Sequence, residues 1–413
     1  MSAITAKASR KMKKYAVLTR EPRCFLGSFD LSWEQRKLGD IADIVGGGTP
    51  STGNQSYWDG DIDWYAPAEI ADQIYANSSQ KKITGLGYEN SSAKMLPPGT
   101  VLFTSRAGIG KTAILTRKGC TNQGFQSIVP HRGELDSYFI FSRTEELKRY
   151  GELVGAGSTF AEVSGKQMAV MELMMPPTMR EQQTIGGFFQ QLDHLITLHQ
   201  RKYALLFSPF QSFISMMFTT STFSWEQRKF SELVQIERGG SPRPIDDFIT
   251  DAPNGLNWVK IGDAPTQGNY ITKTAEKIRP EGLSKTREVH PGDLILSNSM
   301  SFGKPYIMGI DGCIHDGWLL IRNTYGVFDL TFLCHLLGTP QMLSQYRSLA
   351  AGSTVNNLNK ELVENTVVTI PSITEQRVLG DYLEQLDNLI TLHQRELEKL
   401  QNIKKSMLEK MFV

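Results

Sequence analysis

The sequence lacks the features that identify most metal-binding, disulfide-stabilised and membrane proteins. Its four cysteines include no Cys-x-x-Cys pair, and none stands at metal-ligand spacing from a histidine. We therefore expect free thiols in a reducing cytosol and no bound metal. No run of about 20 apolar residues is present, so no segment is predicted to span a membrane. The N-terminus is basic but has no apolar core of signal-peptide length. Together these absences predict a cytoplasmic protein.

Motifs of the common catalytic sites are also missing. There is no Gly-x-Ser-x-Gly, no His-Glu-x-x-His and no Asn-Pro-Pro-aromatic motif of the amino-methyltransferase kind. The segment Arg106–Thr112 resembles a phosphate-binding P-loop, but Ser105 stands where that pattern needs glycine. In a related segment later in the chain, Pro305 follows Lys304 and replaces the hydroxyl that would bind Mg²⁺. A Gly-Lys turn after a strand is the preferred interpretation, with no catalytic site and no cofactor in this chain.

Charge is almost balanced. Lys and Arg number 44 and Asp and Glu number 43, which gives a formal net charge of +1. A nucleic-acid-binding protein usually carries a basic patch or stripe, and this total gives no sign of one. Residues 1–37 are basic, with nine basic and three acidic side chains. At 413 residues and 40% apolar content, the chain is large enough for two or three ordinary domains.

The chain does contain an internal duplication. Six segments recur in the same order at an offset of 192 to 195 residues, so the protein is two copies of one unit. The edges and helical parts of the copies are nearly identical, while the residues between them have diverged. Shared edges indicate a common scaffold, and diverged middles indicate two different ligands. The matched segments are Ser32–Lys37 with Ser224–Lys229, Gly47–Pro50 with Gly239–Pro242, Gly110-Lys111 with Gly303-Lys304, Gly119-Cys120 with Gly312-Cys313, Gly157–Thr159 with Gly352–Thr354, and Gln191–Arg201 with Gln385–Arg395.

Each copy begins with short apolar runs between Gly-, Pro-, Asn- and Asp-rich turns, which indicates strands. Within these regions we predict short helices over Asp136–Leu153 and Leu330–Leu349. A long helix follows in each copy, beginning near Arg180 and near Thr374, the latter just after Pro371. The predicted fold class is α+β, with two mixed α/β domains joined by a pair of long helices in a pseudo-twofold internal repeat. The predicted segments are an N-terminal extension (1–31), a first domain (32–177), a central helix (178–222), a second domain (223–372) and a C-terminal helix (373–413).

Seam residues in both long helices are spaced alternately three and four apart. Such spacing, held over four heptads, predicts a face that packs against a partner helix. We expect the two helices to pair as an antiparallel coiled coil, and the alternative is that each seam lies on the core of its own domain. The seam positions are Ile185, Phe189, Leu192, Ile196, His199, Tyr203, Leu206, Phe210, Phe213 and Met217 in the first helix, and Leu379, Leu383, Leu386, Ile390, His393, Leu397, Leu400, Lys404, Met407 and Met411 in the second.

Two polar positions and a proline interrupt this apolar pattern. His199 and His393 occupy equivalent seam positions, where polar residues usually fix the register; a shared metal site is the alternative. Pro209 is expected to kink or end the first helix, whereas the second has no proline there and can continue to the C-terminus. Trp33 and Trp225 stand at identical places in the two copies, and we expect them to pack structurally where each domain begins.

Taken together, these segments resemble the specificity subunits of type I restriction-modification systems. The resemblance covers residues 32–413, whereas residues 1–31 match nothing in it. No single segment is decisive, but the duplicated set in this order is specific. The segments that carry it are Trp-Glu-Gln-Arg-Lys-Leu at 33–38 and its copy at 225, Gly-Gly-Thr-Pro at 47–50 and its copy, Gly-Ile-Gly-Lys at 108–111, Gly-Ser-Thr at 157–159, and Gln-Leu-Asp-x-Leu-Ile-Thr-Leu-His-Gln-Arg in both helices.

The resemblance implies a non-catalytic subunit that recognises specific sequences in double-stranded DNA. Each divergent region is expected to be a target-recognition domain that reads one half of a split target. The paired helices are expected to set the gap between the halves, and to dock two methyltransferase subunits and up to two restriction subunits. S-adenosylmethionine and ATP with Mg²⁺ are then expected in those partner subunits. The alternatives are a two-domain protein-interaction scaffold and, less favoured, an ATPase or nuclease that uses the Gly-Lys segment.

Few residues need to contact DNA in this view, because partner subunits can supply phosphate contacts and specificity needs only a few base-edge contacts. Arginine is the usual reader of guanine, and asparagine of adenine. The expected contacts in the first domain are Arg106 and Lys111, followed by Lys81 and Lys82. Those in the second are Arg243, Asn298 and Lys304, followed by Lys260 and Lys273. Stacking on bases is conceivable for the tryptophans of the divergent regions, but a core role is expected; they are Trp58, Trp64, Trp258 and Trp318.

Overall fold

The chain folds into two compact units. The first comprises residues up to Thr197 together with those from Lys399 onward, and the second comprises Leu198–Glu398. Each unit therefore contains one globular domain and parts of both long helices. The predicted extension at 1–31 and both Gly-Ser-Thr segments lie outside the described residues. The computed structural model describes residues 33–70, 73–106, 108–156, 161–219, 225–266, 268–298, 302–350 and 358–412.

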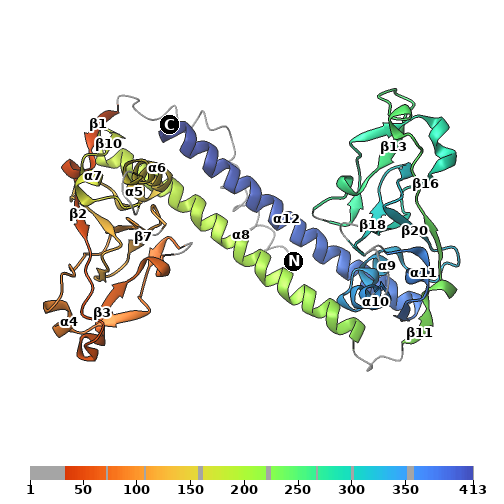
Figure 1. The fold of residues 1–413 in the computed structure, drawn as a ribbon, viewed down its shortest axis with the longest axis horizontal. Helices are drawn as coiled ribbons and strands as arrows, with labels where there is room; N and C mark the ends of the chain where they lie inside the picture. Colours follow the sequence, from red (N-terminus) through yellow and green to blue (C-terminus); the bar gives the residue numbers. More distant parts are fainter. Residues whose placement is uncertain are drawn as a thin grey trace, which may run out of the picture. The chain divides into compact units, whose positions relative to one another are not determined.

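The domain of the first unit (Figure 1) is built on a five-stranded sheet. Its strands lie in the order β2-β9-β6-β7-β4. A second sheet, β5-β3-β8, and a ribbon that pairs β1 with β10 complete its strands. Strand pairs are antiparallel except β4 with β7 and β3 with β8. The strands are β1 (Glu34–Lys37), β2 (Ala42–Gly46), β3 (Trp58–Tyr65), β4 (Tyr75–Ala76), β5 (Lys81–Ile83), β6 (Val101–Phe103), β7 (Thr112–Leu115), β8 (Cys120–Thr121), β9 (Gln126–Pro130) and β10 (Glu172–Met175). The helices are α3 (Leu38–Ile41), α4 (Gly85–Glu89), α5 (Ser137–Ser142), α6 (Thr144–Gly155) and α7 (Gly165–Ala169).

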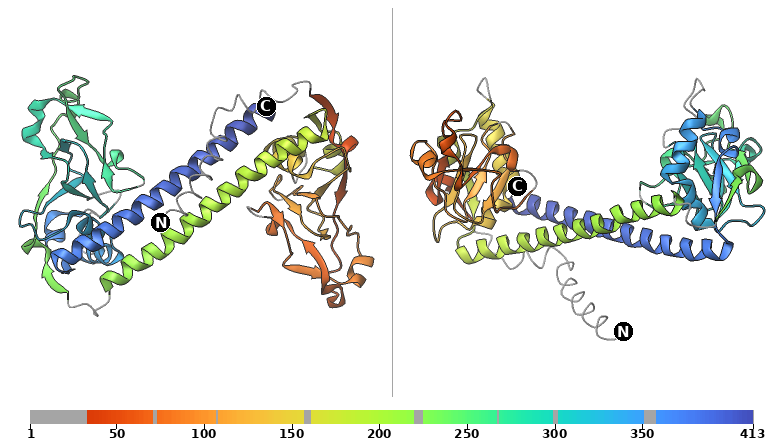
Figure 2. Two further views of the ribbon diagram at one scale, coloured as in Figure 1. Left: turned by 180° about the vertical axis from the view of Figure 1, so that it is seen from behind. Right: turned by 90° about the horizontal axis from the view of Figure 1, so that it is seen from below.

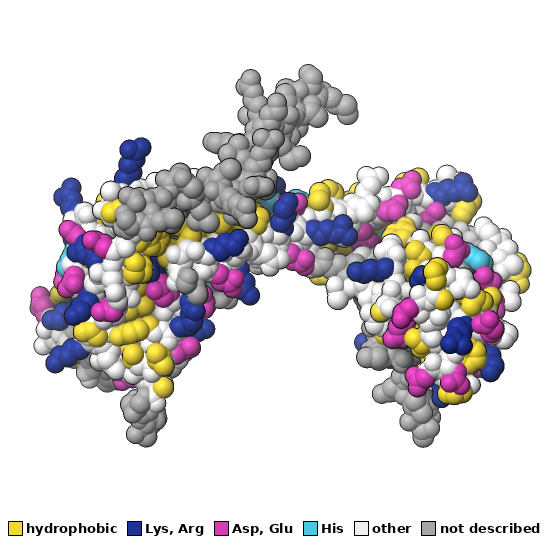
Figure 3. Space-filling model, turned by 90° about the horizontal axis from the view of Figure 1, so that it is seen from above, with side chains coloured by type: hydrophobic (Ala, Val, Ile, Leu, Met, Phe, Trp, Pro, Cys, Tyr) yellow, Lys and Arg dark blue, Asp and Glu magenta, His cyan; other side chains and the backbone are white. Residues whose placement is uncertain are grey.

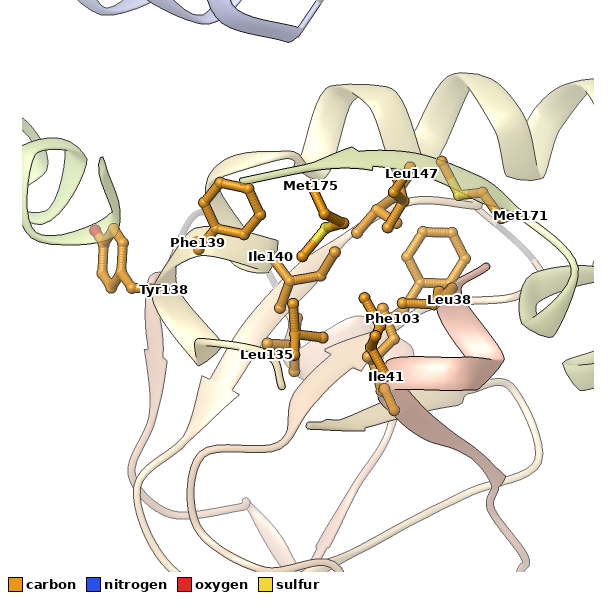
Figure 4. Close-up of a cluster of buried hydrophobic side chains, with 14 of the residues drawn as sticks. Leu38, Ile41, Phe103, Leu135, Tyr138, Phe139, Ile140, Leu147, Met171 and Met175 are labelled. Carbon is orange, nitrogen blue, oxygen red and sulfur yellow. The ribbon is translucent and has the colours of Figure 1, made fainter. Parts of the chain in front are cut away.

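The central strand β6 is buried on both faces. Val101 and Phe103 belong to the main core, which α5 and α6 help to build, and Leu102 belongs to a second cluster. This alternation follows from the two-residue period of a strand. Figure 4 shows how Phe103, Leu147 and the side chains around them converge from several elements. A strand buried on both faces appears in the sequence as a continuous apolar run. This run is the feature from which a strand was predicted here.

The predicted helix over Asp136–Leu153 is two helices, α5 and α6, which meet at Arg143. The Arg143 guanidinium is buried, where it donates to the carboxylate of Glu146 and to the carbonyl oxygen of Met174. The second predicted short helix, over Leu330–Leu349, is likewise divided into α9 and α10. Both predictions located the helical region and missed the break within it.

The domain of the second unit repeats this architecture. Its five-stranded sheet has the order β12-β20-β17-β18-β14, which matches the first domain strand for strand, and a ribbon pairs β11 with β21. The smaller sheet, β15-β13-β19-β16, has one strand more than its counterpart. The strands are β11 (Glu226–Lys229), β12 (Gln235–Arg238), β13 (Leu256–Val259), β14 (Tyr270–Ile271), β15 (Glu276–Ile278), β16 (Arg287–Val289), β17 (Leu294–Ser297), β18 (Pro305–Met308), β19 (Gly312–Ile314), β20 (Trp318–Arg322) and β21 (Val367–Ile370). The helices are α9 (Leu330–Leu337), α10 (Pro340–Ala350) and α11 (Lys360–Glu364).

The two predicted long helices are α8 (Met179–Thr219) and α12 (Ile373–Phe412). In each unit the beginning of one helix packs against the end of the other, so they run in opposite directions (Figure 2). The predicted antiparallel pairing is therefore confirmed within each unit. The pairing residues are Ile185, Phe189 and Leu192 with Leu400, Met407 and Met411 in the first unit, and Tyr203, Leu206 and Phe210 with Leu379, Leu383, Leu386 and Ile390 in the second.

The helix α8 does not end at Pro209 but continues to Thr219. Proline removes one N–H donor from a helix, and the neighbouring residues Leu206 and Phe210 pack against α12 in the second unit. This packing accounts for the continuation of the helix beyond Pro209. Within the described ranges, no helix is both long enough and apolar enough to cross a membrane.

A repeated pair of contacts attaches each domain to the start of its long helix. The indole N–H of Trp33 donates to Glu181 Oε1 at 3.1 Å, and Trp225 donates to Glu375 Oε1 at the same distance. The predicted packing role of these two tryptophans at the beginning of each domain is thus confirmed. Because donor and acceptor both recur, this joint belongs to the duplicated scaffold.

A buried glutamine reinforces the same joint. Gln182 accepts a bond from the N–H of Asp136 and donates to the carbonyl oxygen of Glu134, so it joins α8 to the start of α5. Gln376 makes the corresponding bonds in the second unit, where Asp329 is one of its partners. Both glutamines are nearly fully buried. Their amides satisfy backbone groups that would otherwise be buried without partners.

A buried aspartate has different partners in the two units. Asp193 accepts bonds from Lys404 Nζ at 2.6 Å and from the Tyr138 hydroxyl at 2.9 Å. Burial and the neighbouring Asp193 charge raise the pKa of Tyr138. The equivalent Asp387 accepts a bond from the Asn269 amide, and burial raises the pKa of Asp387 to about 6. The seam lysine predicted at 404 therefore has a specific partner in the first unit.

His199 and His393 face each other in the second unit, with ring centroids 5.5 Å apart. Burial lowers the pKa of both rings, and the nearby positive charge of Lys202 lowers them further. Among the described residues, no group of three or more His, Cys, Asp or Glu side chains could hold a metal ion. The pair therefore has the geometry of a seam contact between two neutral rings.

Candidate nucleic-acid interface

Three loops converge in each domain, and the duplicated motifs supply two of them. We call this surface the three-loop face. The N–H groups and side chains of the loops bond to one another, so that segments far apart in the sequence form one surface. The described part of the face comprises residues 47–51, 104–106, 108–111 and 121–124 in the first domain, and 239–243, 297–298, 302–304 and 314–317 in the second.

Backbone hydrogen bonds hold the three-loop face of the first domain together. The N–H of Gly48 donates to the Thr121 carbonyl at 2.9 Å, and the N–H of Ser105 donates to the Gly124 carbonyl at 2.8 Å. A Cβ atom at Gly47 would overlap the carbonyl oxygen of Thr121. The glycines of the first motif are therefore required for close approach of two backbones.

The second domain uses the same contacts. The N–H of Gly240 donates to the Ile314 carbonyl at 3.2 Å, and the N–H of Asn298 donates to the Gly317 carbonyl at 2.9 Å. A Cβ atom at Gly239 would overlap the carbonyl oxygen of His315. The repeated Gly-Gly-[Thr/Ser]-Pro motif therefore has one structural role in both copies.

The Gly-Lys segment is a hairpin turn in both domains. The N–H of Lys111 donates to the Thr104 hydroxyl at 2.9 Å, and the N–H of Lys304 donates to the Ser297 hydroxyl at 3.0 Å. Gly110 has a φ of 95°, a backbone region that favours glycine. The segment connects two antiparallel strands, whereas a P-loop leads from a strand into a helix. The predicted Gly-Lys turn is thus confirmed.

The expected cations of the first domain differ in their availability. Lys111 is exposed on the hairpin, and Arg106 is 38% exposed with its guanidinium 3.9 Å from the Glu162 carboxylate. Lys81 is exposed, with its ammonium 6.0 Å from the centre of the Trp58 ring. An exposed ion pair of this length is weak, so Arg106 can exchange its partner for a phosphate.

Lys82 takes part in an ion cluster around a buried carboxylate. Asp63 lies 2.6 Å from Arg117 Nε and 3.4 Å from Lys82 Nζ, and it accepts two bonds from Ser79. Burial by itself would raise the pKa of Asp63, but the Ser79 bonds and the two cations lower it overall. The cluster holds Arg117, which the sequence reasoning did not select, on the surface beside Lys82.

Arg243 and Lys304 are placed differently in the second domain. The Arg243 side chain is 82% exposed, with Nη2 3.7 Å from Asp316 Oδ2. Lys304 is only half exposed, and its ammonium lies 4.9 Å from the centre of the Tyr306 ring. Arg243 can therefore reach a ligand directly, whereas Lys304 must leave an aromatic ring to do so.

The expectation that Asn298 reads adenine is not compatible with its position. Asn298 is 5% exposed, and its side-chain amide donates to the carbonyl oxygen of Asp316 at 2.8 Å. The amide thus supports the turn at Asp316 and is not presented to a ligand. Ser105 occupies the corresponding place in the first domain and is also fully buried.

The sheet registers show how the exposed residues of the two domains differ. Lys81 on β5 stands opposite Trp64 on the neighbouring strand β3. In the second domain, Glu276 on β15 stands opposite Trp258 on β13. A lysine of the first domain therefore corresponds to a glutamate of the second. Glu276 forms an ion pair with the ammonium of Lys260, so this expected DNA contact already has a partner within the domain.

Most tryptophans of the divergent regions belong to the core. Trp64, Trp258 and Trp318 are at most 6% exposed, so they are not available for stacking on bases, and the expected core role is confirmed. Trp58 is half buried and packs edge to face against Trp64. Figure 3 shows Lys and Arg side chains interspersed with Asp and Glu on the visible face of each domain. This mixture agrees with the balanced total charge.

Gln123 and Asp316, which were not among the expected DNA contacts, lie at equivalent points of the three-loop face. The hydroxyl of Thr49 bonds to Gln123 Oε1, and the hydroxyl of Ser241 donates to Asp316 Oδ1 at 2.9 Å. The repeated Thr/Ser was visible in the sequence. Its partner was not, because Gln123 and Asp316 lie in the diverged regions and share no residue type.

Comparison with known proteins agrees with the sequence resemblance. The family model of the type I restriction modification DNA specificity domain matches residues 31–206 and again residues 224–402. The chain is 30% identical over 262 residues to the type I restriction enzyme MjaIX specificity subunit of Methanocaldococcus jannaschii. That match covers 58% of this chain and 60% of the relative, which is less than two thirds of its length. A putative MjaX specificity subunit from the same organism is 21% identical, with 93% of each chain covered.

Solved structures share the fold. The type I restriction-modification S subunit from M. genitalium superposes with a TM-score of 0.62 at 12% identity, covering 93% of this chain and 97% of that chain. A chain from a type I R-M system studied for its complex assembly and conformational transition gives a TM-score of 0.50 at 18% identity, with 93% and 98% covered. At these identities the likeness concerns the fold alone.

Proposed function

Because this chain belongs to the family of type I restriction-modification DNA specificity subunits, we propose that its two target-recognition domains each read one half of a split target in double-stranded DNA. The paired helices α8 and α12 dock two methyltransferase subunits and up to two restriction subunits. Those partners bind S-adenosylmethionine, and ATP with Mg²⁺, and carry out adenine methylation and DNA cleavage in the cytoplasm. This chain supplies recognition and geometry, and no catalytic group.

The observation that carries the proposal is the contrast between a repeated scaffold and unlike exposed residues. Both domains have the same strand order in their five-stranded sheets and the same three-loop face. On that scaffold Lys81 corresponds to Glu276, and Gln123 corresponds to Asp316. Base edges are distinguished by their patterns of donors and acceptors. Two domains that present different polar groups from one framework are therefore suited to two different base sequences.

The balanced charge fits a subunit that binds DNA together with partners. Each phosphate contact made by Lys or Arg adds affinity that falls as salt rises. The exposed or half-exposed cations proposed for such contacts are few, and Asn298 is not among them. They are Arg106, Lys111, Lys81 and Lys82 in the first domain, and Arg243 and Lys304 in the second. We expect the isolated chain to bind DNA weakly and its methyltransferase complex to bind tightly.

Mapping of methylated adenines across the host genome tests the proposed function. With the gene present, we expect methylation at a motif of two short sequences separated by a fixed gap. With the gene deleted, that motif should lose its methylation. If deletion changes no methylation, the chain does not direct a methyltransferase. Gel-shift titration of a fragment containing the motif, with and without the methyltransferase subunit, then separates DNA recognition from a protein-interaction scaffold, which would show no sequence preference.

A further inference from the structure

Arg243 and Asp316 form an ion pair on the three-loop face of the second domain. Nη2 of Arg243 lies 3.7 Å from Oδ2 of Asp316. The other carboxylate oxygen, Oδ1, accepts the hydroxyl of Ser241 at 2.9 Å. The carboxylate is thus held on one side, and it lies beside a guanidinium whose side chain is 82% exposed.

The turn that carries Asp316 is itself anchored. The buried amide of Asn298 donates to the Asp316 carbonyl at 2.8 Å, and the Asn298 N–H donates to the Gly317 carbonyl at 2.9 Å. The loop that carries Arg243 is joined to the same region by the bond from Gly240 to Ile314. The loops that carry the two residues are therefore held in place before a ligand binds, which a specific contact needs.

Guanine is the base whose edge fits this pair. It presents the acceptors O6 and N7 in the major groove, and an arginine donates to both at once. A carboxylate beside the arginine attracts the guanidinium and reduces the positive charge available to a phosphate. Phosphate contacts depend mainly on that charge, whereas a base edge is met by the guanidinium N–H groups. The arrangement around Arg243 therefore favours a base over the DNA backbone.

The corresponding place in the first domain carries an amide. Gln123 is exposed, and its Oε1 bonds to the hydroxyl of Thr49, as Asp316 bonds to Ser241. A second lone pair of Oε1 and the NH₂ group are then available to adenine, whose N6 amino group and N7 form the matching edge.

The geometry points to Arg243, which lies beside Asp316, as the reader of a guanine in one half-site, and to Gln123, which is bonded to Thr49, as the reader of an adenine in the other. This inference rests on the proposed function, because it assumes that the three-loop face meets DNA. It assigns two specificity-determining residues and two positioning residues. Positions 123 and 316 are equivalent in the fold, so the difference between half-sites arises partly at one point of a shared scaffold.

Methylation rates of the purified complex with its methyltransferase subunit test this assignment, on a set of DNA targets changed one base pair at a time. The wild-type complex should prefer guanine at one position of one half-site by about 10- to 100-fold. Arg243→Ala should abolish that preference and leave the preferences of the other half-site unchanged. Asp316→Asn keeps the arginine and should reduce the same preference. Gln123→Ala should act only on an adenine of the opposite half-site.

Arg228→Ala is the control, since Arg228 is a partly exposed arginine of β11 that pairs with Glu232, in the scaffold shared by both copies. It should leave every base preference intact. A uniform loss of rate on all targets with Arg243→Ala would mean a phosphate contact and overturn the inference, as would an unchanged preference. If Arg243→Ala abolishes methylation altogether, the Asp316→Asn variant gives the decisive result. An unchanged preference for guanine in that variant would contradict the assignment. A wild-type complex with no split target would instead contradict the proposed function.

Discussion

Two adjacent glycines in α8 meet different surroundings. A Cβ atom at Gly186 would lie 2.8 Å from Asp136 Oδ1 and 2.9 Å from the Phe139 nitrogen, whereas at Gly187 it would meet nothing within 4 Å. We predict that Gly186→Ala destabilises the first unit by about 1–3 kcal/mol, since α8 and α5 must separate to make room. Gly187→Ala should stabilise it by up to about 1 kcal/mol, because alanine favours helix.

Urea unfolding of the two variants, followed by circular dichroism, measures this difference. The two substitutions change the same atoms in the same helix, so each serves as the control for the other. Equal effects would mean that α8 does not approach α5 as closely as the structure has it. The same test applies to Gly380, which faces Asp329 in the second unit.

Lys404 illustrates how a residue can break a pattern for a local reason. It neutralises Asp193, which is 6% exposed, and Lys404→Met would leave that carboxylate without its cation. We predict a loss of about 1–3 kcal/mol, below the full value for a buried pair because Lys404 is partly exposed. Thermal unfolding measures the loss, with Lys405→Met, an exposed neighbour, as the control.

The pairing itself is tested by a second substitution. Adding Asp193→Asn to Lys404→Met removes the buried charge, and part of the lost stability should return. Strictly additive effects of the two changes would show that the ion pair does not contribute. Neither the partner of Lys404 nor the burial of Asn298 could be predicted from the sequence, because both depend on contacts between segments far apart in the chain.

At the scale of an element, the paired histidines of the long helices predict a pH dependence. The pKa values of His199 and His393 are lowered, so the unfolded chain binds more protons than the folded one near pH 6. Their contribution to stability is therefore complete above the ordinary histidine pKa of about 6.5 and falls as pH decreases below it. Two charged rings beside Lys202 repel one another, which weakens the helix pair in acid.

The double variant His199→Leu/His393→Leu isolates this effect. Its advantage over the wild type in thermal midpoint should grow between pH 7 and pH 5, because leucines in the seam carry no charge. His335, whose pKa burial lowers to about 4, acts in the same direction in both proteins and drops out of the comparison. A difference that stays constant with pH would show that the histidine pair does not titrate in this range.

Regular elements were the part of the fold most open to prediction. The seam spacing located both long helices and predicted that they pair, since periodicity is a local property of the chain. The antiparallel direction was expected from the near-identity of the two copies and from the family resemblance. Where a helix breaks or continues was harder to predict. The break at Arg143 follows from a buried guanidinium that binds a distant carbonyl, and the helix persists past Pro209 because its neighbours pack on α12. Tertiary contacts decide these points.

At the scale of the whole molecule, the duplication was the most informative feature of the sequence. It predicted two domains of one architecture, and the matching strand orders confirm this. It also marked the glycines that bring the loops of the three-loop face together, without showing which loops they join. Most expected DNA contacts could be chosen only by residue type. Lys81 and Arg243 lie exposed, whereas Lys260 is paired and Asn298 is buried.

Exchange of residues 38–177 for those of another family member, followed by mapping of methylated adenines, tests the central claim most directly. If each domain reads its own half of the target, one half of the methylated motif should change to that of the donor protein. The other half should stay as it was, because the second domain keeps its three-loop face. A motif in which both halves change, or neither does, would contradict independent reading by two domains on one repeated scaffold.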